Sequence, residues 1–256
     1  QGIVRKNNSY ALAIHNDTLK FAGNPWTWID FGIPVEMNTW THLAVVQNGT
    51  EAILYKNGIL EATVAQNGNL AINSNPAEIG RDDYNNWYWG GLIDEVRISS
   101  TSRTPEEIKA AAQRRPSATY TSPVVDLGTT QVVSLDDLSW EASGQATGDG
   151  ETPFSTQDLV AQWNLNETSG VAASVAGGSC GSSCNGTLVN FTNTSGQDVT
   201  PLSGWSAQHK RWGAGGLMFD GIDDYVSIVD HPHFTLGSDD FTISFWIKNH
   251  NSPNGT

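Results

Sequence analysis

The chain has 256 residues, of which 16% are charged and 26 are glycine, and it is rich in Asn, Ser and Thr. This composition favours many short strands joined by tight turns over long helices. A formal net charge of −14 argues against binding nucleic acid or an anionic bilayer through a general positive field, and it leaves cation ligands open.

No apolar run approaches the roughly 18 residues that a membrane helix needs, so we expect no membrane insertion. No charged-then-apolar signal peptide opens the chain. The sequence begins with Gln1, and we therefore expect a processed product or an excised piece of a longer protein.

Residues 1–100 are predicted to form a meander of hairpins. Strand-like segments such as "YALAIH", "THLAVVQ" and "EAILYK" are separated by "HNDT", "QNGT" and "KNGI", and Asn-Gly is the strongest two-residue hairpin signal. The last segment, "GGLIDEVRIS", is predicted to be a strand. Its alternation places Asp94 and Glu95 on opposite faces.

One short helix follows in "TPEEIKAAAQRRP". Thr104 and Glu107 form a capping box, Pro105 takes the first turn and Pro116 lies just beyond the end. Residues 117–157 are predicted to contain two short strands, "TYTSPVVDLG" and "VSLDDLSW", and a Gly/Thr/Ser-rich linker.

Strands resume with "LVAQWNL", "GGLMFDG" and "DYVSIVD", and the last is "FTISFWIK". In this terminal strand Phe241, Ile243, Phe245 and Ile247 alternate with more polar residues, which is typical of a half-buried strand. A turn-forming cluster follows and the chain stops. Because a lone strand cannot bury its apolar face, the terminal strand needs a partner from elsewhere in the chain or from another molecule.

Several of these segments resemble a known protein family in their residues, and some of them also in their order. "WTHLAVVQNGTEAILYKNGIL" and "GGLIDEVRISSTSRTPEEI" resemble the C-terminal half of the laminin-G-like, concanavalin-A-like jelly-roll modules of secreted and surface proteins. "LVAQWNLNETSG", "NGTLVN", "GGLMFDGIDDYVSI" and "DFTISFWIK" resemble the N-terminal half of the same module. The resemblance implies an all-β, antiparallel β-sandwich, a jelly roll with one short helix.

The two halves occur here in the opposite order to that of the family module. This implies either one period of a tandem array or a circular permutant, with Gln1 as the natural continuation of Thr256. We expect residues 1–116 and 158–256 to complete one sandwich within a monomer, with residues 117–157 as the linker. The rival is a swapped filament, in which each half pairs with another molecule.

The family includes glycosidases, so catalysis has to be considered. Retaining enzymes need two carboxylates roughly 5 Å apart, and in this family they typically lie in a Glu-x-Asp-x-x-Glu pattern, which the sequence lacks. Asp94 and Glu95 are predicted to point to opposite faces and cannot flank one bond. We expect no hydrolase activity.

A structural Ca²⁺ is the stronger expectation from the resemblance. Family jelly rolls often hold this ion where the last strand starts beside the end of the first, and antiparallel pairing would bring Asp94 near Asn164, Asn166 and Glu167. Hard oxygen donors from two distant strands are what Ca²⁺ requires. The alternative is that Asp94 only accepts hydrogen bonds from turn amides. Further acidic candidates are Asp223 and Asp224.

Cys180 and Cys184, in "GGSCGSSCNGT", are the only cysteines. Their spacing in a Gly/Ser loop predicts a small disulfide, although two free thiols would have the same sequence. Without two further ligands they make a poor zinc site. A disulfide suits an extracellular or cell-surface location. His231 and His233 share a face if extended, but without a third ligand a plain loop is favoured over a metal site.

The chain has ten tryptophans, and most of them are expected in the core. The exceptions lie in "NPWTWID" and "DDYNNWYWGG", where aromatic rings stand among Asp and Asn. Aromatic faces that stack on sugar rings, with amides and carboxylates for the hydroxyls, are how this fold binds glycans. The candidate ligand-binding residues are Trp26, Trp28, Tyr84, Asn85, Asn86 and Trp87.

A glycan platform in these loops requires Trp87 to be largely exposed, whereas packing of the rim would bury it. The sequence as a whole predicts a non-catalytic extracellular recognition or adhesion module that binds a glycan or a cell-surface or matrix ligand. The alternatives are a ligand-free spacer repeat of a surface protein and a divergent glycoside hydrolase.

Overall fold

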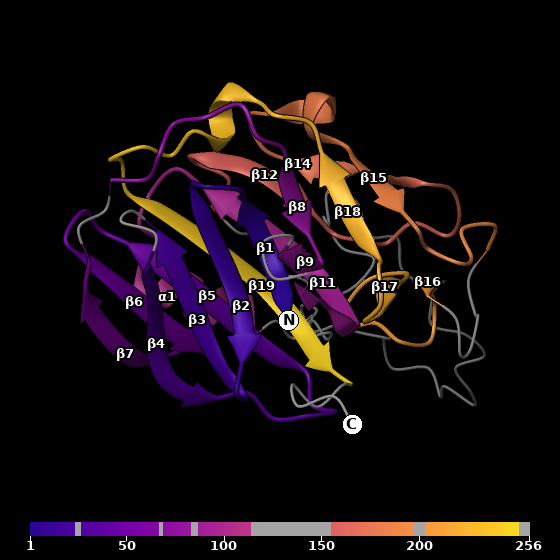
Figure 1. Ribbon diagram of the computed structural model, residues 1–256, viewed down its shortest axis with the longest axis horizontal. Helices are drawn as coiled ribbons and strands as arrows, with labels where there is room; N and C mark the ends of the chain where they lie inside the picture. Colours follow the sequence, from indigo (N-terminus) through magenta and orange to yellow (C-terminus); the bar gives the residue numbers. More distant parts are fainter. Residues whose placement is uncertain (24–26, 67–68, 83–86, 114–154, 197–202, 251–256) are drawn as a thin grey trace, which may run out of the picture.

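The computed structural model describes residues 1–23, 27–66, 69–82, 87–113, 155–196 and 203–250. Two antiparallel sheets pack face to face around one hydrophobic core, so the predicted all-β sandwich is confirmed (Figure 1). The two short strands predicted within residues 117–157 lie outside the described residues.

The first sheet has the strand order β13-β15-β18-β8-β1-β2-β3-β4. Its members are β1 (Gly2–Lys6), β2 (Tyr10–His15), β3 (Thr18–Gly23), β4 (Thr27–Pro34), β8 (Ala77–Ile79), β13 (Ala172–Ala173), β15 (Gly186–Val189) and β18 (Tyr225–Ile228). A separate two-stranded ribbon consists of β9 (Arg81–Asp82) and β10 (Trp87–Tyr88).

The second sheet has the order β14-β12-β11-β19-β5-β6-β7, and β17 pairs with both β11 and β16 beside this path. Its members are β5 (Thr41–Gln47), β6 (Glu51–Lys56), β7 (Ile59–Ala65), β11 (Gly90–Ser99), β12 (Leu159–Trp163), β14 (Val175–Gly177), β16 (Gly204–Ser206), β17 (Gly216–Asp220) and β19 (Phe241–Asn249). The described helical segments are α1 (Pro105–Ala112) and the 3₁₀ turns η1 (Gly181–Cys184) and η2 (Pro232–Phe234).

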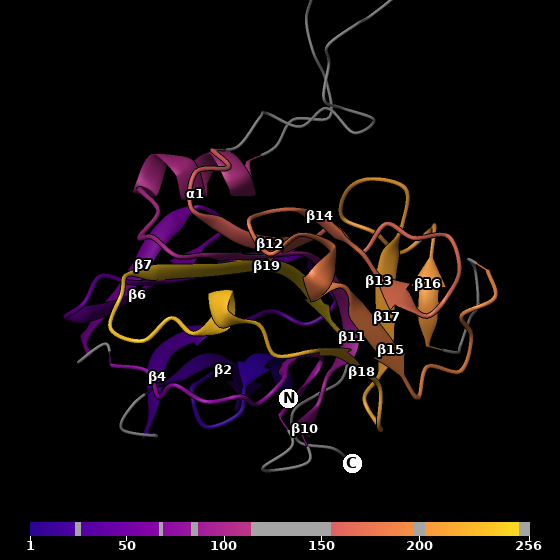
Figure 2. The ribbon, with the colours of Figure 1, turned by 90° about the horizontal axis from the view of Figure 1, so that it is seen from above.

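The terminal strand finds its partners within the same chain. β19 lies between β11 and β5, with Ile243 opposite Ile98 on one side and Val45 on the other. In the first sheet, β18 pairs with β8. Strands from both halves of the chain therefore share both sheets. Figure 1 shows β19 crossing the molecule behind β1 and β2, and Figure 2 shows β19 and β2 in opposite layers.

Period-two alternation selects the residues of the core. Phe241, Ile243, Phe245 and Ile247 are all fully buried in the core cluster, as the sequence predicts. Burying a side chain of this size contributes roughly 1.5 to 3 kcal/mol. The four residues lie between strands of the first half of the chain, so this contribution depends on both halves being in place.

The helix α1 covers the outer face of the second sheet (Figure 2). The N–H of Glu107 donates to Thr104 Oγ1 (3.2 Å), and the N–H of Thr104 donates to Glu107 Oε2 (2.9 Å). The predicted capping box is thereby confirmed. Ile108 packs with Ala44, Val46 and Tyr55 in a small second core, so the helix shields strands β5 and β6 from water.

A β-bulge interrupts β11 at the acidic pair. The register with β19 shifts between Asp94 and Arg97, and Glu95 has a positive φ of 52°. Asp94 is opposite Trp246, on the outer face. Gln162, which is paired with Arg97, donates from Nε2 to Glu95 Oε2 (3.2 Å). The predicted placement of the two carboxylates on opposite faces is therefore wrong, because the extra residue of a bulge breaks the alternation.

The interleaved topology predicts that both halves unfold together. Phe245→Ala should lower the free energy of unfolding by about 3 to 5 kcal/mol, because it leaves a cavity between β19 and its neighbours. Denaturant unfolding followed by tryptophan fluorescence and by circular dichroism should give one coincident transition. Val229→Ala is the matched control, because Val229 is 72% exposed and should change stability by less than about 0.5 kcal/mol. Two separate transitions would contradict the interleaved fold.

Candidate functional site

The outer face of the first sheet carries a floor of small side chains. On β2 and β3, Ala11, Ala13 and Ala22 alternate with core residues and yet are at most 1% exposed. Ala22 is directly opposite Trp28 of β4, whose ring lies on the same outer face. Small residues leave room here for larger side chains to lie flat over the sheet.

The ribbon of β9 and β10 brings a second tryptophan to this face. The ring of Trp87 stacks on His15 with centroids 5.0 Å apart and planes at 19°, and it lies 6.3 Å from the ring of Trp28. We call His15, Trp28 and Trp87 the aromatic cluster. It joins the end of β2, the start of β4 and the ribbon, which are distant in sequence.

The cluster agrees in part with the sequence-based expectation. Trp28 and Trp87 are brought together, as expected of a platform, but Trp87 is half-buried. Trp87 is thus neither largely exposed, as a platform predicts, nor fully buried, as packing of the rim predicts, because His15 covers part of its ring. The other candidates, Trp26, Tyr84, Asn85 and Asn86, lie outside the described residues.

Charged and hydrogen-bonding groups border the aromatic cluster. Lys20 Nζ and Asp30 Oδ2 form an ion pair at 2.9 Å, and the N–H of Gly32 donates to Asp30 Oδ1 at 2.9 Å. Burial opposes ionisation of Asp30, but these hydrogen bonds lower its pKa. Partial burial and the nearby Lys20 charge lower the pKa of His15. At neutral pH the face therefore offers a neutral imidazole, a carboxylate and an ammonium group.

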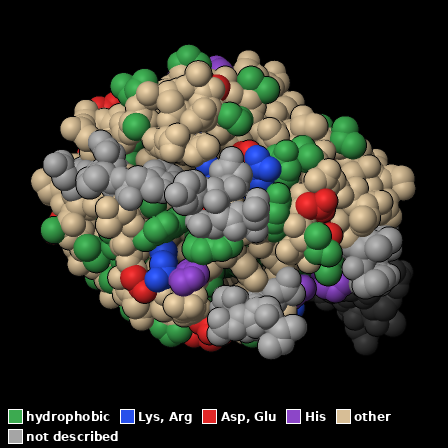
Figure 3. Space-filling view, viewed as in Figure 1, with side chains coloured by type: hydrophobic (Ala, Val, Ile, Leu, Met, Phe, Trp, Pro, Cys, Tyr) green, Lys and Arg blue, Asp and Glu red, His purple; other side chains and the backbone are tan. Residues whose placement is uncertain are grey.

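Figure 3 shows this face of the molecule. Hydrophobic side chains gather near its middle, with basic, acidic and histidine side chains at their edge. Half-buried aromatic rings beside donors and acceptors suit a ligand that is both apolar and rich in hydroxyls.

Buried ion pairs anchor the ribbon that carries Trp87. Arg5 of β1 is fully buried and pairs with Asp82 of β9 at 2.5 Å. Arg81 pairs with Glu78 at 2.6 Å, and its guanidinium lies 3.8 Å from the ring centroid of Tyr225. Removing one partner of a buried pair typically costs about 3 to 5 kcal/mol. The position of Trp87 is thus fixed by charges that are buried or largely buried.

Asp94 is the acidic candidate for a metal that lies deepest in the fold. Its side chain is fully buried, and Oδ2 accepts from the N–H groups of Arg211 (2.8 Å) and Trp212 (3.1 Å). Hydrogen bonding to turn amides, the alternative weighed from the sequence, is thus observed for this oxygen. Oδ1 is buried without a hydrogen-bond partner. Burial, with the neighbouring Glu95 charge, raises the pKa of Asp94 well above its usual value.

The other three predicted calcium ligands lie together beside Asp94's loop. Asn164, Asn166 and Glu167 line one shallow hollow, and Asp94 is not among its lining residues. With its amide group turned to satisfy both neighbours, Asn166 donates to the carbonyl of Gly215 at 2.9 Å. Asp94 and Asn166 therefore contact the same loop, residues 211–215. The free Oδ1 of Asp94 and these oxygen donors are chemically suited to Ca²⁺.

A second acidic group includes the other predicted candidates. Carboxylate oxygens of Asp220, Asp223 and Asp224 lie within 4.8 Å of one another. Asp224 is fully buried, its Oδ2 accepts from the N–H of Asp220 (2.8 Å), and its Oδ1 has no partner. Burial raises the pKa of Asp224 to about 6, and the nearby Asp220 charge adds to the shift.

Three residues of the candidate site were not predicted from the sequence. They are His15, Lys20 and Asp30. Each occupies an outward position in a period-two strand, next to a turn or opposite a residue of opposite charge. The pairing of Lys20 with Asp30 follows from the register of β3 and β4, which was not predicted from the sequence.

The pKa of Asp224 predicts how stability depends on pH. The folded state holds this proton more tightly than the unfolded chain, so the proton's contribution is complete below pH 3.8 and is lost as pH rises through about 6. In chelator-containing buffer, Asp224→Asn should stabilise the protein at pH 7, by at most about 3 kcal/mol at roughly 1.4 kcal/mol per pKa unit. At pH 4 it should change stability little.

Thermal melts at both pH values test this, with Asp223→Asn as the control because Asp223 is exposed. An equal effect of Asp224→Asn on the melting temperature at the two pH values would show that burial does not raise the pKa of Asp224.

Within the part of the chain that the structure describes, the helices are too short to span a bilayer.

Comparison of the chain with models of protein families gives a match for its first part. Residues 2–109 match the model Laminin_G_3, described as the concanavalin A-like lectin/glucanases superfamily. No curated protein and no solved structure matches the chain significantly. The matched segment runs from β1 into α1 and covers less than half of the chain.

Proposed function

We propose that the protein is a non-catalytic carbohydrate-binding module that holds its ligand at the aromatic cluster. The observation that carries this is the joining of Trp28, Trp87 and His15 on one outer face, beside the Lys20–Asp30 pair. The superfamily of residues 2–109 contains lectins and glucanases by its own description.

The ligand class follows from the chemistry of this face. A pyranose ring has an apolar face that stacks on indole, and its edge carries hydroxyls that donate and accept hydrogen bonds. Asp30 supplies acceptors and Lys20 supplies donors at that edge. The stacking of Trp87 on His15 fixes the indole before the ligand arrives, which lowers the ordering cost of binding. An extracellular or cell-surface location, as part of a recognition or adhesion protein, is consistent with this chemistry.

Two features favour binding without hydrolysis. Asp94 and Glu95 share the outer face of the second sheet but are only 0% and 3% exposed. A glycosidase needs its two carboxylates on either side of a bound sugar, and a substrate has no access to these two. The Asp30 carboxylate of the aromatic cluster is already paired with Lys20.

A ligand-free spacer repeat is the second candidate function. The buried alanine floor beneath the aromatic cluster favours it, because the rings could serve only to cover that floor. Removal of an aromatic ring distinguishes the two functions. It should weaken glycan binding by a carbohydrate-binding module, whereas a spacer binds no glycan in the first place.

Replacement of Trp87 separates these functions. Trp87→Ala should reduce binding to a glycan array by about two- to twelvefold, since stacking on an aromatic ring is worth roughly 0.5 to 1.5 kcal/mol. Trp40→Ala is the matched control, because Trp40 is also half-buried but leads into the second sheet. It should leave binding unchanged.

The absence of glycan binding by the wild-type protein, on arrays with and without Ca²⁺, would favour the spacer. Release of reducing sugar from any glycan that binds would instead revive a hydrolytic function.

We also propose a structural Ca²⁺ held by Asp94, with Asn164, Asn166 and Glu167 as further oxygen donors. The support is the buried, unpartnered Oδ1 of Asp94 beside the loop that Asn166 also contacts. A divalent cation would offset the repulsion between Asp94 and Glu95 and hold the 211–215 loop against β11. This is a role in stability and is separate from binding of the glycan.

Calcium should therefore raise the melting temperature of the wild-type protein. A ligand that binds only the folded state adds about 2.7 kcal/mol at a hundredfold excess over its dissociation constant. Asp94→Asn keeps an acceptor for the two loop amides but removes the charge, so its melting temperature should be the same with Ca²⁺ and with chelator. A wild-type melting temperature that does not respond to Ca²⁺ would remove the ion from this site.

A further inference from the structure

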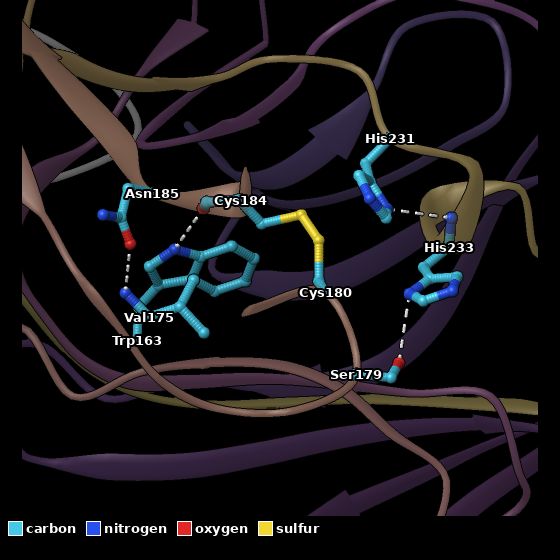
Figure 4. The surroundings of a disulfide bond; sticks show 8 residues. All are labelled: Trp163, Val175, Ser179, Cys180, Cys184, Asn185, His231 and His233. Carbon is cyan, nitrogen blue, oxygen red and sulfur yellow. Dashed lines mark hydrogen bonds between the residues drawn. A yellow bond between two sulfur atoms is a disulfide. The ribbon is translucent and has the colours of Figure 1, made fainter. Parts of the chain in front are cut away.

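The loop of the two cysteines and the loop of the two histidines meet in space. Cys180 precedes η1 and Cys184 is its last residue, and their sulfurs form a disulfide. His231 and His233 belong to the segment that contains η2, about 50 residues later in the sequence. The sulfur of Cys180 and one nitrogen from each imidazole lie within 4.8 Å of one another. Figure 4 shows both rings on the same side of the disulfide.

A single buried indole holds the two loops together. Trp163 of β12 is fully buried, its Nε1 donates to the carbonyl of Cys184 (3.0 Å), and its ring stacks on Phe234 of η2 at 6.1 Å. The N–H of Cys180 also donates to the carbonyl of Val160 (3.0 Å). Both potential ligand segments are therefore placed by the core rather than by flexible surface contacts.

We propose that Cys180, Cys184, His231 and His233 form a redox-dependent zinc site. In the oxidised chain the two cysteines are joined, and in the reduced chain the two thiolates and two imidazoles bind one Zn²⁺. Two cysteines and two histidines are a ligand set for structural zinc. In the sequence, the two cysteines and the two histidines each lack the further ligands that a zinc site needs. The fold brings the two pairs together, so that each pair completes the other.

The geometry needs only local adjustment. In a tetrahedral zinc site the ligand atoms are roughly 3.3 to 3.8 Å apart, since Zn–N and Zn–S bonds are about 2.0 to 2.3 Å. Three of the four ligand atoms, the sulfur of Cys180 and one nitrogen of each imidazole, already lie within 4.8 Å of one another, and the fourth, the sulfur of Cys184, is bonded to that of Cys180. His233 is exposed and His231 is half-buried, so both rings can turn. Cys184 is fully buried, so its side chain has less freedom and must rotate away from Cys180.

The histidine hydrogen bonds indicate which nitrogens bind. His233 Nδ1 lies 3.1 Å from Ser179 Oγ; if Nδ1 carries the proton and donates, Nε2 is left for the metal. Such an outer hydrogen bond is usual for a metal-binding histidine. His231 Nδ1 accepts from the N–H of His233 at 3.3 Å. Binding through Nε2 of His231 would move its proton to Nδ1 and break this long hydrogen bond.

Conversion of the disulfide into the zinc site begins with a two-electron reduction. A dithiol reductant supplies two electrons and two protons, which break the sulfur–sulfur bond and give two thiols, while the reductant becomes a disulfide. Zn²⁺ then displaces the two thiol protons to solvent. The resulting site, with two thiolates and two neutral imidazoles around Zn²⁺, has no net charge, which suits the partly buried position of the cysteines.

Cobalt(II) is the probe, because it binds in place of zinc and reports its ligands by colour. The full chain, reduced with a phosphine that does not itself hold the metal, should bind one Co²⁺ with visible bands typical of a tetrahedral ion and a thiolate-to-cobalt charge-transfer band. Zn²⁺ should displace the Co²⁺. The oxidised chain should show no charge-transfer band.

His233→Ala tests the geometry without removing the disulfide, and it should weaken Co²⁺ binding by at least tenfold in the reduced chain. Cys180→Ser leaves only the Cys184 thiolate and should weaken the charge-transfer band by at least about half. The matched control is His209→Ala, because His209 is half-buried and bonds to Ser206 instead; it should bind Co²⁺ like the wild type.

Equal Co²⁺ affinity of wild type and His233→Ala, or no stoichiometric binding by the reduced chain, would overturn the proposal. A charge-transfer band that is identical in the oxidised chain would overturn it as well. None of these outcomes depends on glycan binding, so the zinc site and the proposed function fail or stand separately.

Discussion

The position of β19 in the second sheet is the constraint on which the rest of the structure depends. The last strand of the described chain lies between β11 and β5, so the second sheet has no continuous centre until residues 241–249 are in place. The four apolar residues of its inner face are then covered by the first sheet, where β18 pairs with β8. Strands from the two ends of the chain thus meet as neighbours in the second sheet. Hydrogen-bond ladders and apolar burial depend on neighbours in space and not on order along the chain.

Local patterns were sufficient to predict much of this fold. The Asn-Gly turns, the period-two strands and the capping box at Thr104 act over a few residues, and each is present in the structure. The bulge at Glu95 was not predictable, because nothing in "LIDEVRI" distinguishes a regular strand from one with an extra residue. That single residue places Asp94 and Glu95 on one face and changes what both carboxylates contact.

The candidate sites were harder to predict because their residues come from distant segments. The sequence drew attention to Trp28 and Trp87, but it could not show that His15 would cover part of Trp87. That contact depends on the Arg5–Asp82 ion pair, which fixes the ribbon over the first sheet. The same reason explains the cysteines and histidines. Each pair appears incomplete in sequence, and only the packing of Trp163 against both loops brings them together.

Sedimentation equilibrium tests the central claim, that one chain closes its own sandwich, most directly. After unfolding and refolding at low concentration, the protein should sediment as a monomer of 27.6 kDa over at least a hundredfold range of concentration, with an unchanged melting temperature. Intrachain closure does not depend on concentration, whereas pairing between chains does. A mass that rises with concentration, together with loss of the folded state on dilution, would show that β19 finds its partners in another molecule.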